Sequence, residues 1–198
     1  RWTQIFEMGG IPSATTVLKA RPIDDSEHPS FMPAPVEEVV ATIEAERPDM
    51  VFAPHVETSS GMILPDDYLR SVADAVHGVG GMFVLDCIAS GAIWVDMKVS
   101  GVDVLISAPQ KGWSSSPCAG LVMLNSVALE RLKSTTSTSF AGDLRKWLEI
   151  MQAYEKGGHA YHATMPTDAL ARFRDTMKET EAYGFSKVCG EQQELGDK

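Results

Sequence analysis

Two kinds of hydrophobic pattern alternate along most of the chain. Short, uninterrupted apolar runs predict buried strands at residues 50–54, 82–86, 103–108 and 119–125. Stretches with apolar residues at helical spacing predict amphipathic helices at residues 36–47, 66–81, 127–133, 143–157 and 167–185. Buried strands that alternate with amphipathic helices predict an α/β fold, with a mostly parallel sheet covered by helices on both faces.

Local signals refine several of these elements. In residues 36–47 the apolar face consists of Val36, Val39, Val40 and Ile43, and Pro48 ends the helix. The β-branched stretch TTVLKA at 15–20 predicts a further short strand, and the proline-rich residues 21–35 predict a loop. Ser126 is expected to cap the helix that follows it.

Composition and charge exclude some classes of function. The 198 residues carry a formal net charge of −10, which argues against a general nucleic-acid binder, and no apolar run is long enough to span a bilayer. Cys87, Cys118 and Cys189 are odd in number and lack the spacing of metal ligands, so no metal site is expected. Reduced thiols indicate a cytoplasmic protein.

Polar residues follow three of the predicted strands. His55, Glu57 and Thr58 come after the first strand, Asp86 ends the second, and Gln110 and Lys111 follow the third. In open α/β sheets ligands bind beyond the carboxyl ends of the strands. We therefore expect a functional site where these residues meet.

Asp86 and Lys111 have complementary chemistry. A carboxylate at the end of a buried strand needs a cationic partner or a hydrogen-bond donor, although capping of the turn that follows is an alternative explanation. Most lysines are solvated surface amines, but Lys111 precedes a hydroxyl-rich, uncharged stretch, GWSSS. A desolvated lysine can form a Schiff base, and pyridoxal 5′-phosphate (PLP) needs such a lysine together with an acidic partner for its pyridine nitrogen.

Four sequence motifs, two of which contain Asp86 and Lys111, resemble the motifs of a known enzyme family. HVETSSG (55–61), VLDCIAS (84–90), SAPQKGW (107–113) and YHATMP (161–166) resemble, in order and spacing, the class V aminotransferases of PLP fold type I. The alanine–glyoxylate and serine–pyruvate aminotransferase branch is the most similar. The opening residues 1–10 also resemble the segment that follows the first phosphate-binding region of this family.

The resemblance implies a role for each matching residue. Lys111 would be the Schiff-base lysine and proton carrier, Asp86 the partner of the pyridine nitrogen, and Ile88 a packing contact on the ring. Thr58 would bind near the phenolic oxygen and Gln110 at the phosphate. Tyr161 and Thr164 would reach the phosphate of the partner subunit's cofactor, which implies a homodimer with shared sites.

The family also implies a domain arrangement. Residues 1–165 would form part of the large PLP-binding domain, and residues 166–198 would lead towards a small C-terminal domain. The first residue is Arg1, and no arginine matches the family's carboxylate-binding position, so we expect a chain truncated at both ends. No carboxylate-binding residue is assigned.

Three functions are compatible with these residues. The first is a transaminase that moves an amino group from a small amino acid, alanine- or serine-like, to a 2-oxo acid such as glyoxylate or pyruvate. The second is another class V enzyme, a lyase or a cysteine desulfurase, for which Cys118 is the candidate nucleophile, although its sequence surroundings indicate burial. The third is a non-catalytic scaffold that keeps the fold without holding the cofactor.

Overall fold

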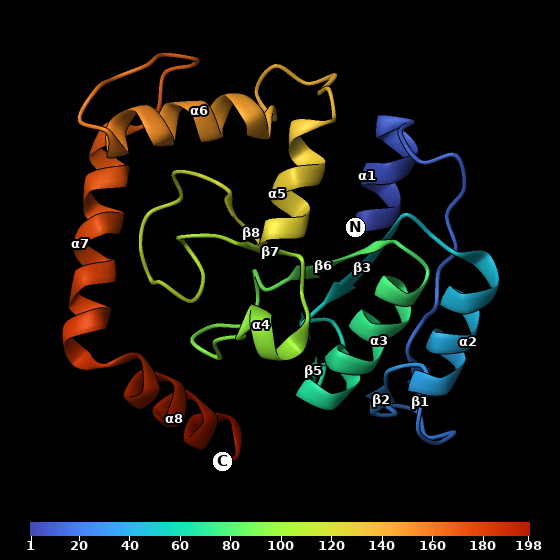
Figure 1. Cartoon of the computed structure of the whole chain (residues 1–198). Coiled ribbons are helices and arrows are strands. Elements are labelled where there is room, and N and C mark those ends of the chain that lie inside the picture. Colours follow the sequence, from blue (N-terminus) through green and yellow to red (C-terminus); the bar gives the residue numbers. More distant parts are fainter. The chain divides into compact units, whose positions relative to one another are not determined.

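The structure is a computed structural model that describes residues 1–198. The chain forms two compact units (Figure 1). The first unit contains Arg1–Ser90 and Val95–Val102, and the second contains Gly91–Trp94 and Asp103–Lys198. None of the helices has the length and apolar character needed to cross a bilayer.

The first unit contains a parallel pair of strands and two small antiparallel pairs. Its helices are α1 (Trp2–Gly9), α2 (Val36–Glu46), α3 (Asp66–Gly78) and α4 (Met97–Ser100). Its strands are β1 (Arg21–Pro22), β2 (Phe31–Met32), β3 (Met50–Pro54), β4 (Val56–Glu57), β5 (Met62–Ile63) and β6 (Met82–Asp86). β3 pairs with β6 in parallel, whereas β1–β2 and β4–β5 are antiparallel.

The core of this unit lies where α3 packs against α2 and β6, and Figure 1 shows α2 and α3 side by side. α3 buries one face, formed by Leu69, Val72, Ala73 and Val76. This spacing of three and four residues is the apolar stripe that the sequence predicted. The four residues 82–85 of β6 are all buried, as expected for a strand that is covered on both faces.

α2 follows the sequence prediction closely. Val39 and Ile43 are buried, and the helix ends at Glu46. Arg47 then adopts the left-handed conformation with φ 49°, and its N–H donates to the Ile43 carbonyl, which closes the last turn before Pro48.

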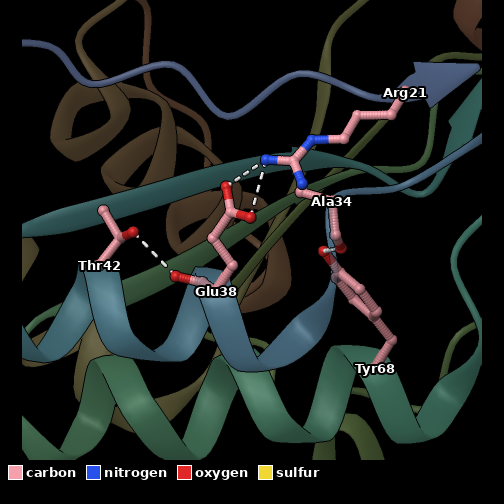
Figure 2. Close-up of polar contacts among 5 residues, drawn as sticks. All are labelled: Arg21, Ala34, Glu38, Thr42 and Tyr68. Atoms are coloured by element: carbon pink, nitrogen blue, oxygen red, sulfur yellow. Dashed lines mark hydrogen bonds and ion pairs between the residues drawn. The ribbon is translucent and has the colours of Figure 1, made fainter.

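Polar contacts tie α2 and α3 to the segment before them (Figure 2). Arg21 Nη2 lies 2.6 and 2.7 Å from the two carboxylate oxygens of Glu38. The Tyr68 hydroxyl donates to the Ala34 carbonyl at 2.8 Å, and burial raises the pKa of this phenol, with the charges of α2 adding to the effect. These bonds hold residues 21–34 against the two helices although that segment has little regular structure.

Two predictions for the N-terminal part of the chain are wrong. Residues 15–20 do not form a strand, because no other strand pairs with them and most of their side chains are exposed. β-Branched residues suit an extended backbone, but a strand also requires a partner for its N–H and C=O groups. The predicted loop at 21–35 contains the short β1–β2 pair, in which Arg21 faces Met32 and Pro22 faces Phe31.

The second unit combines an antiparallel strand pair with four helices. Its elements are β7 (Val104–Ser107), β8 (Leu121–Leu124), α5 (Ser126–Lys133), α6 (Leu144–Glu155), α7 (Thr167–Tyr183) and α8 (Phe185–Gly196). β7 and β8 pair from Val104 opposite Leu124 to Ser107 opposite Leu121. The domain boundary expected near residue 166 stays a prediction.

The cap of α5 differs from the prediction. Asn125, and not Ser126, is the N-cap: its Oδ1 accepts from the Ala128 N–H at 2.9 Å. The same side chain donates from Nδ2 to the buried Asp103 carboxylate at 2.7 Å. Asparagine can do both because the oxygen of its amide accepts and the nitrogen donates.

Candidate functional site

Asp86 lies at the carboxyl end of β6, where the parallel β3 also ends. Pro54 is its register partner, and the His55 N–H donates to the Asp86 carbonyl at 2.9 Å. The half-buried carboxylate accepts from Trp2 Nε1 through Oδ2 and from the Ile88 N–H through Oδ1, both at 3.0 Å. Within its unit no lysine or arginine pairs with it. Neutral donors thus orient a carboxylate whose charge is left available for a cationic ligand group.

Sequence reasoning missed Trp2. This residue begins α1, and its ring packs on Phe6 and Phe52 with centroids 5.8 and 4.9 Å away. The only local signal was the pair of aromatic residues at positions 2 and 6, one helical turn apart. The contact with Asp86 joins residues 84 positions apart, and no local pattern indicates it.

Thr58 lies in the turn that connects β4 and β5. Its side chain is exposed, so the hydroxyl is accessible. The neighbouring Glu57 carboxylate accepts from the Ser59 N–H at 3.0 Å and from the Ser59 hydroxyl at 2.8 Å. These bonds lower the pKa of Glu57, so this carboxylate stays ionised and braces the turn.

Cys87 follows Asp86 and is buried. Burial raises the pKa of its thiol to about 11, the Asp86 charge acts in the same direction, and a hydrogen bond with Ser90 opposes both. The thiol is therefore protonated at neutral pH and packs as a small apolar side chain.

Lys111 lies in a compact loop that follows β7. The loop is closed by backbone bonds from Ser114 N to the Lys111 carbonyl at 2.9 Å and from Ser115 N to the Pro109 carbonyl at 3.0 Å. Ser114 adopts φ 53°, a left-handed conformation that is uncommon for serine. Such backbone strain persists where the surrounding structure determines the conformation, and it clusters at functional sites.

The side chains of this loop fit a phosphorylated aldehyde. Lys111 and Gln110 are exposed, and no carboxylate pairs with the lysine. The Ser115 hydroxyl is buried and has no hydrogen-bond partner. An unpaired amine can condense with an aldehyde, and an amide N–H and an unsatisfied hydroxyl can donate to a phosphate.

Trp113 anchors the Lys111 loop by aromatic packing. Its ring lies 5.0 Å from Trp94, 5.8 Å from Phe173 and 6.3 Å from Phe185, measured between centroids. At Gly112 the backbone approaches Gly91 so closely that a Cβ atom there would clash with the Gly91 carbonyl. The loop therefore requires glycine at position 112.

We expect Gly112→Ala to destabilise the second unit by about 1–3 kcal/mol, because the added methyl group would force two backbone segments apart. Gly120→Ala is the matched control, since nothing lies within 4 Å of the Cβ position there, and its effect should stay within about 0.5 kcal/mol. Urea unfolding curves of the two variants and the wild type measure the difference. Equal stability of the two variants would contradict the close approach at Gly112.

Tyr161 and Thr164 lie side by side on the segment before α7. Their hydroxyl oxygens are 3.3 Å apart and both residues are exposed. Between them, His162 Nε2 lies 2.8 Å from the Phe140 carbonyl oxygen, and its ring stacks on Phe140 with a centroid distance of 4.3 Å. His162 thus fixes the segment, on which the two exposed hydroxyl groups form a hydrogen bond with each other.

The predicted residues fall into three local groups. Thr58, Asp86 and Ile88 belong to the first unit, with Asp86 and Ile88 at and after the end of β6 and Thr58 in the β4–β5 turn. Gln110 and Lys111 share one loop of the second unit, and Tyr161 and Thr164 share another segment of that unit. The roles that the resemblance gives to these residues remain predictions.

Known proteins that are similar in sequence to this chain include transaminases of two kinds. The chain is 31% identical over 137 residues to the 2-aminoethylphosphonate–pyruvate transaminase of Paraburkholderia phymatum, which covers 69% of this chain and 35% of that protein. It is 28% identical over 172 residues to alanine–glyoxylate aminotransferase 1 of Saccharomyces cerevisiae, covering 82% and 43%. No protein-family model matches the chain.

The fold agrees with this relationship. The crystal structure of an alanine–glyoxylate aminotransferase from Nostoc sp. matches with a TM-score of 0.76 at 24% identity, over 97% of this chain and 48% of that one. The α/β fold is therefore that of the fold type I aminotransferases, as predicted. The chain belongs to the class V aminotransferases and is similar to the alanine–glyoxylate aminotransferases among them. It spans less than half the length of these relatives.

Proposed function

We propose that this chain carries the cofactor-binding residues of a PLP-dependent aminotransferase, which moves an amino group from a small amino acid, alanine- or serine-like, to a 2-oxo acid such as glyoxylate or pyruvate. The observation that carries the proposal is the Asp86 carboxylate, which two neutral donors orient and no cation of its unit neutralises. The relatives named for alanine and glyoxylate support the choice of substrates.

The residues present fit PLP, which supplies an electron-accepting ring that stabilises negative charge on the substrate carbon. Asp86 holds the proton on the ring nitrogen, because a carboxylate beside that nitrogen favours its charged form. Thr58 donates to the phenolic oxygen, Gln110 donates to the phosphate, and Ile88 packs on the ring. Each of these residues binds or orients and does not react.

Lys111 is the reacting residue of the proposal. Its unpaired Nζ would hold the aldehyde of the cofactor, and as a free amine Lys111 would carry the proton taken from the substrate's α-carbon. The loop bonds around Lys111 and the packing of Trp113 keep the start of this flexible side chain in one place.

A second substrate pair has its own support. The relative from Paraburkholderia phymatum is named for 2-aminoethylphosphonate and pyruvate. Assays of the natural polypeptide at full length, with alanine and glyoxylate, serine and pyruvate, and 2-aminoethylphosphonate and pyruvate, separate the candidates. Turnover with the first or second pair supports the proposal, and turnover with the third alone replaces its substrates. Sulfide release from cysteine would identify a desulfurase, and a protein that stays colourless with added PLP would be a scaffold.

The proposal includes a homodimer in which Tyr161 and Thr164 donate to the phosphate of the partner subunit's cofactor. Their exposure and their adjacent hydroxyl groups support this role. A cytoplasmic location belongs to the same proposal, and the three free cysteines support it because reduced thiols persist there.

Subunit mixing tests the shared site. Homodimers of Lys111→Ala and of the double variant Tyr161→Phe, Thr164→Val should each be impaired. When the two chains are co-expressed, we expect activity to rise to about a quarter of wild type, because random pairing makes half the dimers mixed and each mixed dimer has one intact site of two. If all these residues act within one subunit, mixed dimers contain no intact site and activity will not rise.

A further inference from the structure

The first unit contains a buried polar pair that the proposed roles do not use. His55 follows β3 and Ser90 ends the turn after β6, and each residue is only 3% exposed. His55 Nδ1 lies 2.7 Å from the Ser90 hydroxyl oxygen. Burying two polar side chains costs free energy unless they are hydrogen-bonded to each other or to neighbours, so this pair has a structural cost that its contacts must offset.

His55 is neutral in this position. Burial lowers the pKa of its imidazole, and the charge of Asp66 at the start of α3 only partly opposes that effect. A neutral imidazole has one N–H donor and one acceptor nitrogen, and a serine hydroxyl can complement either. Ser90 also shares a hydrogen bond with the Cys87 thiol, so the histidine, the serine and the cysteine form one uncharged network beside Asp86.

The backbone of His55 joins the two segments that carry the predicted cofactor residues. Its N–H donates to the Asp86 carbonyl at 2.9 Å, and its own carbonyl accepts from the Leu64 N–H at 2.9 Å, which closes the base of the β4–β5 hairpin. Thr58 lies in the turn of that hairpin, three residues after His55. On the other side, the Ser90 N–H donates to the Cys87 carbonyl and completes the turn that begins at Asp86.

We infer that His55 is a positioning residue: through Ser90 and the Asp86 carbonyl it holds the Asp86–Ser90 turn in a fixed relation to the hairpin of Thr58. The Asp86 carboxylate and the Thr58 hydroxyl would then keep a constant separation, so that both could bind one cofactor. This inference rests on the proposed function, since it assigns to His55 the alignment of two of its binding residues. His55 itself touches neither substrate nor cofactor in this role.

The test compares hydrogen-bonding and apolar replacements in the natural polypeptide at full length. His55→Leu removes the bond to Ser90, whereas His55→Asn keeps a polar atom near the position of Nδ1. We expect His55→Leu to weaken PLP binding about tenfold or more, because it removes the His55–Ser90 hydrogen bond from a buried polar network and frees the turn. His55→Asn should recover most of this loss. His28→Leu, the same change in an exposed loop of the same unit, is the control and should bind like wild type.

A spectroscopic readout separates positioning from general stability. The absorption band of bound PLP titrates with pH, and its midpoint depends on how well Asp86 stabilises the protonated ring nitrogen. We expect His55→Leu to shift this midpoint and His55→Asn to restore it. A role in stability alone would lower the melting temperature of His55→Leu and leave the midpoint unchanged in the folded protein.

The possible outcomes distinguish a failure of this inference from a failure of the proposed function. A folded His55→Leu variant with the wild-type dissociation constant and midpoint would overturn the inference while the proposed function stands. If that variant does not fold, Ser90→Ala and Ser90→Thr replace it: the first should show the same shift and the second, which keeps the hydroxyl, should not. A wild-type protein that shows no PLP band overturns the proposed function and this inference with it.

Discussion

Lys111→Ala is expected to lower turnover at least about 10⁴-fold. The substitution removes the amine that would bind the aldehyde covalently and would also move the proton. The variant should also lose the covalent label: wild-type protein treated with PLP and borohydride should carry the reduced cofactor on Lys111, and the variant should carry none. Peptide mapping after reduction measures the label, and a coupled assay measures turnover.

Two controls make this result specific. Lys178→Ala removes an exposed lysine of α7 in the same unit and should leave both the label and turnover as in the wild type. Thermal unfolding of Lys111→Ala should be close to wild type, because the side chain is exposed and forms no ion pair. A label on another lysine, with turnover retained in Lys111→Ala, would show that the reacting residue has been assigned wrongly.

Asp86→Asn is expected to lower turnover by about 10²–10³-fold, the loss found when one preorganised charge-stabilising group is removed from an active site. The amide is nearly the same size but has no charge, so it cannot hold the proton on the ring nitrogen. Asp86→Glu keeps the charge and should retain more activity than the asparagine variant, although its extra methylene displaces the carboxylate. Steady-state rates together with the pH titration of the cofactor band measure both effects.

The hydrogen bonds of Asp86 require a control for structure. Both carboxylate oxygens accept, from Trp2 Nε1 and from the Ile88 N–H, and in the Asp86→Asn variant the new amide nitrogen would face one of these donors without being able to accept from it. Circular dichroism and thermal unfolding therefore accompany the kinetics, with Asp25→Asn in an exposed loop as the matched substitution. Wild-type turnover in a folded Asp86→Asn variant would exclude the proposed role of the charge.

The spacing of apolar residues predicted helices and strands well where the pattern of burial and the local secondary-structure propensity indicate the same element. The helix at 36–46 and the strands at 50–54 and 82–86 follow patterns that only a few consecutive residues define. The prediction failed at 15–20, where β-branched residues were present but no strand pairs with them. The cap of the helix at 126–133 is Asn125 and not the predicted Ser126, and the Asn125 side chain also donates to Asp103, a contact 22 positions away that no local pattern indicates.

The sequence by itself determined the alternating α/β pattern, the family resemblance and the candidate residues, since runs of apolar residues and short motifs are readable within a few positions. Only the tertiary structure decided which groups orient those residues. Trp2 reaches Asp86 across 84 positions, His55 meets Ser90 across 35, and Gly112 packs against Gly91. Such contacts form only when segments that are distant in the sequence pack together. The free energy that favours them comes from the burial of side chains between those segments, which no short stretch of sequence shows.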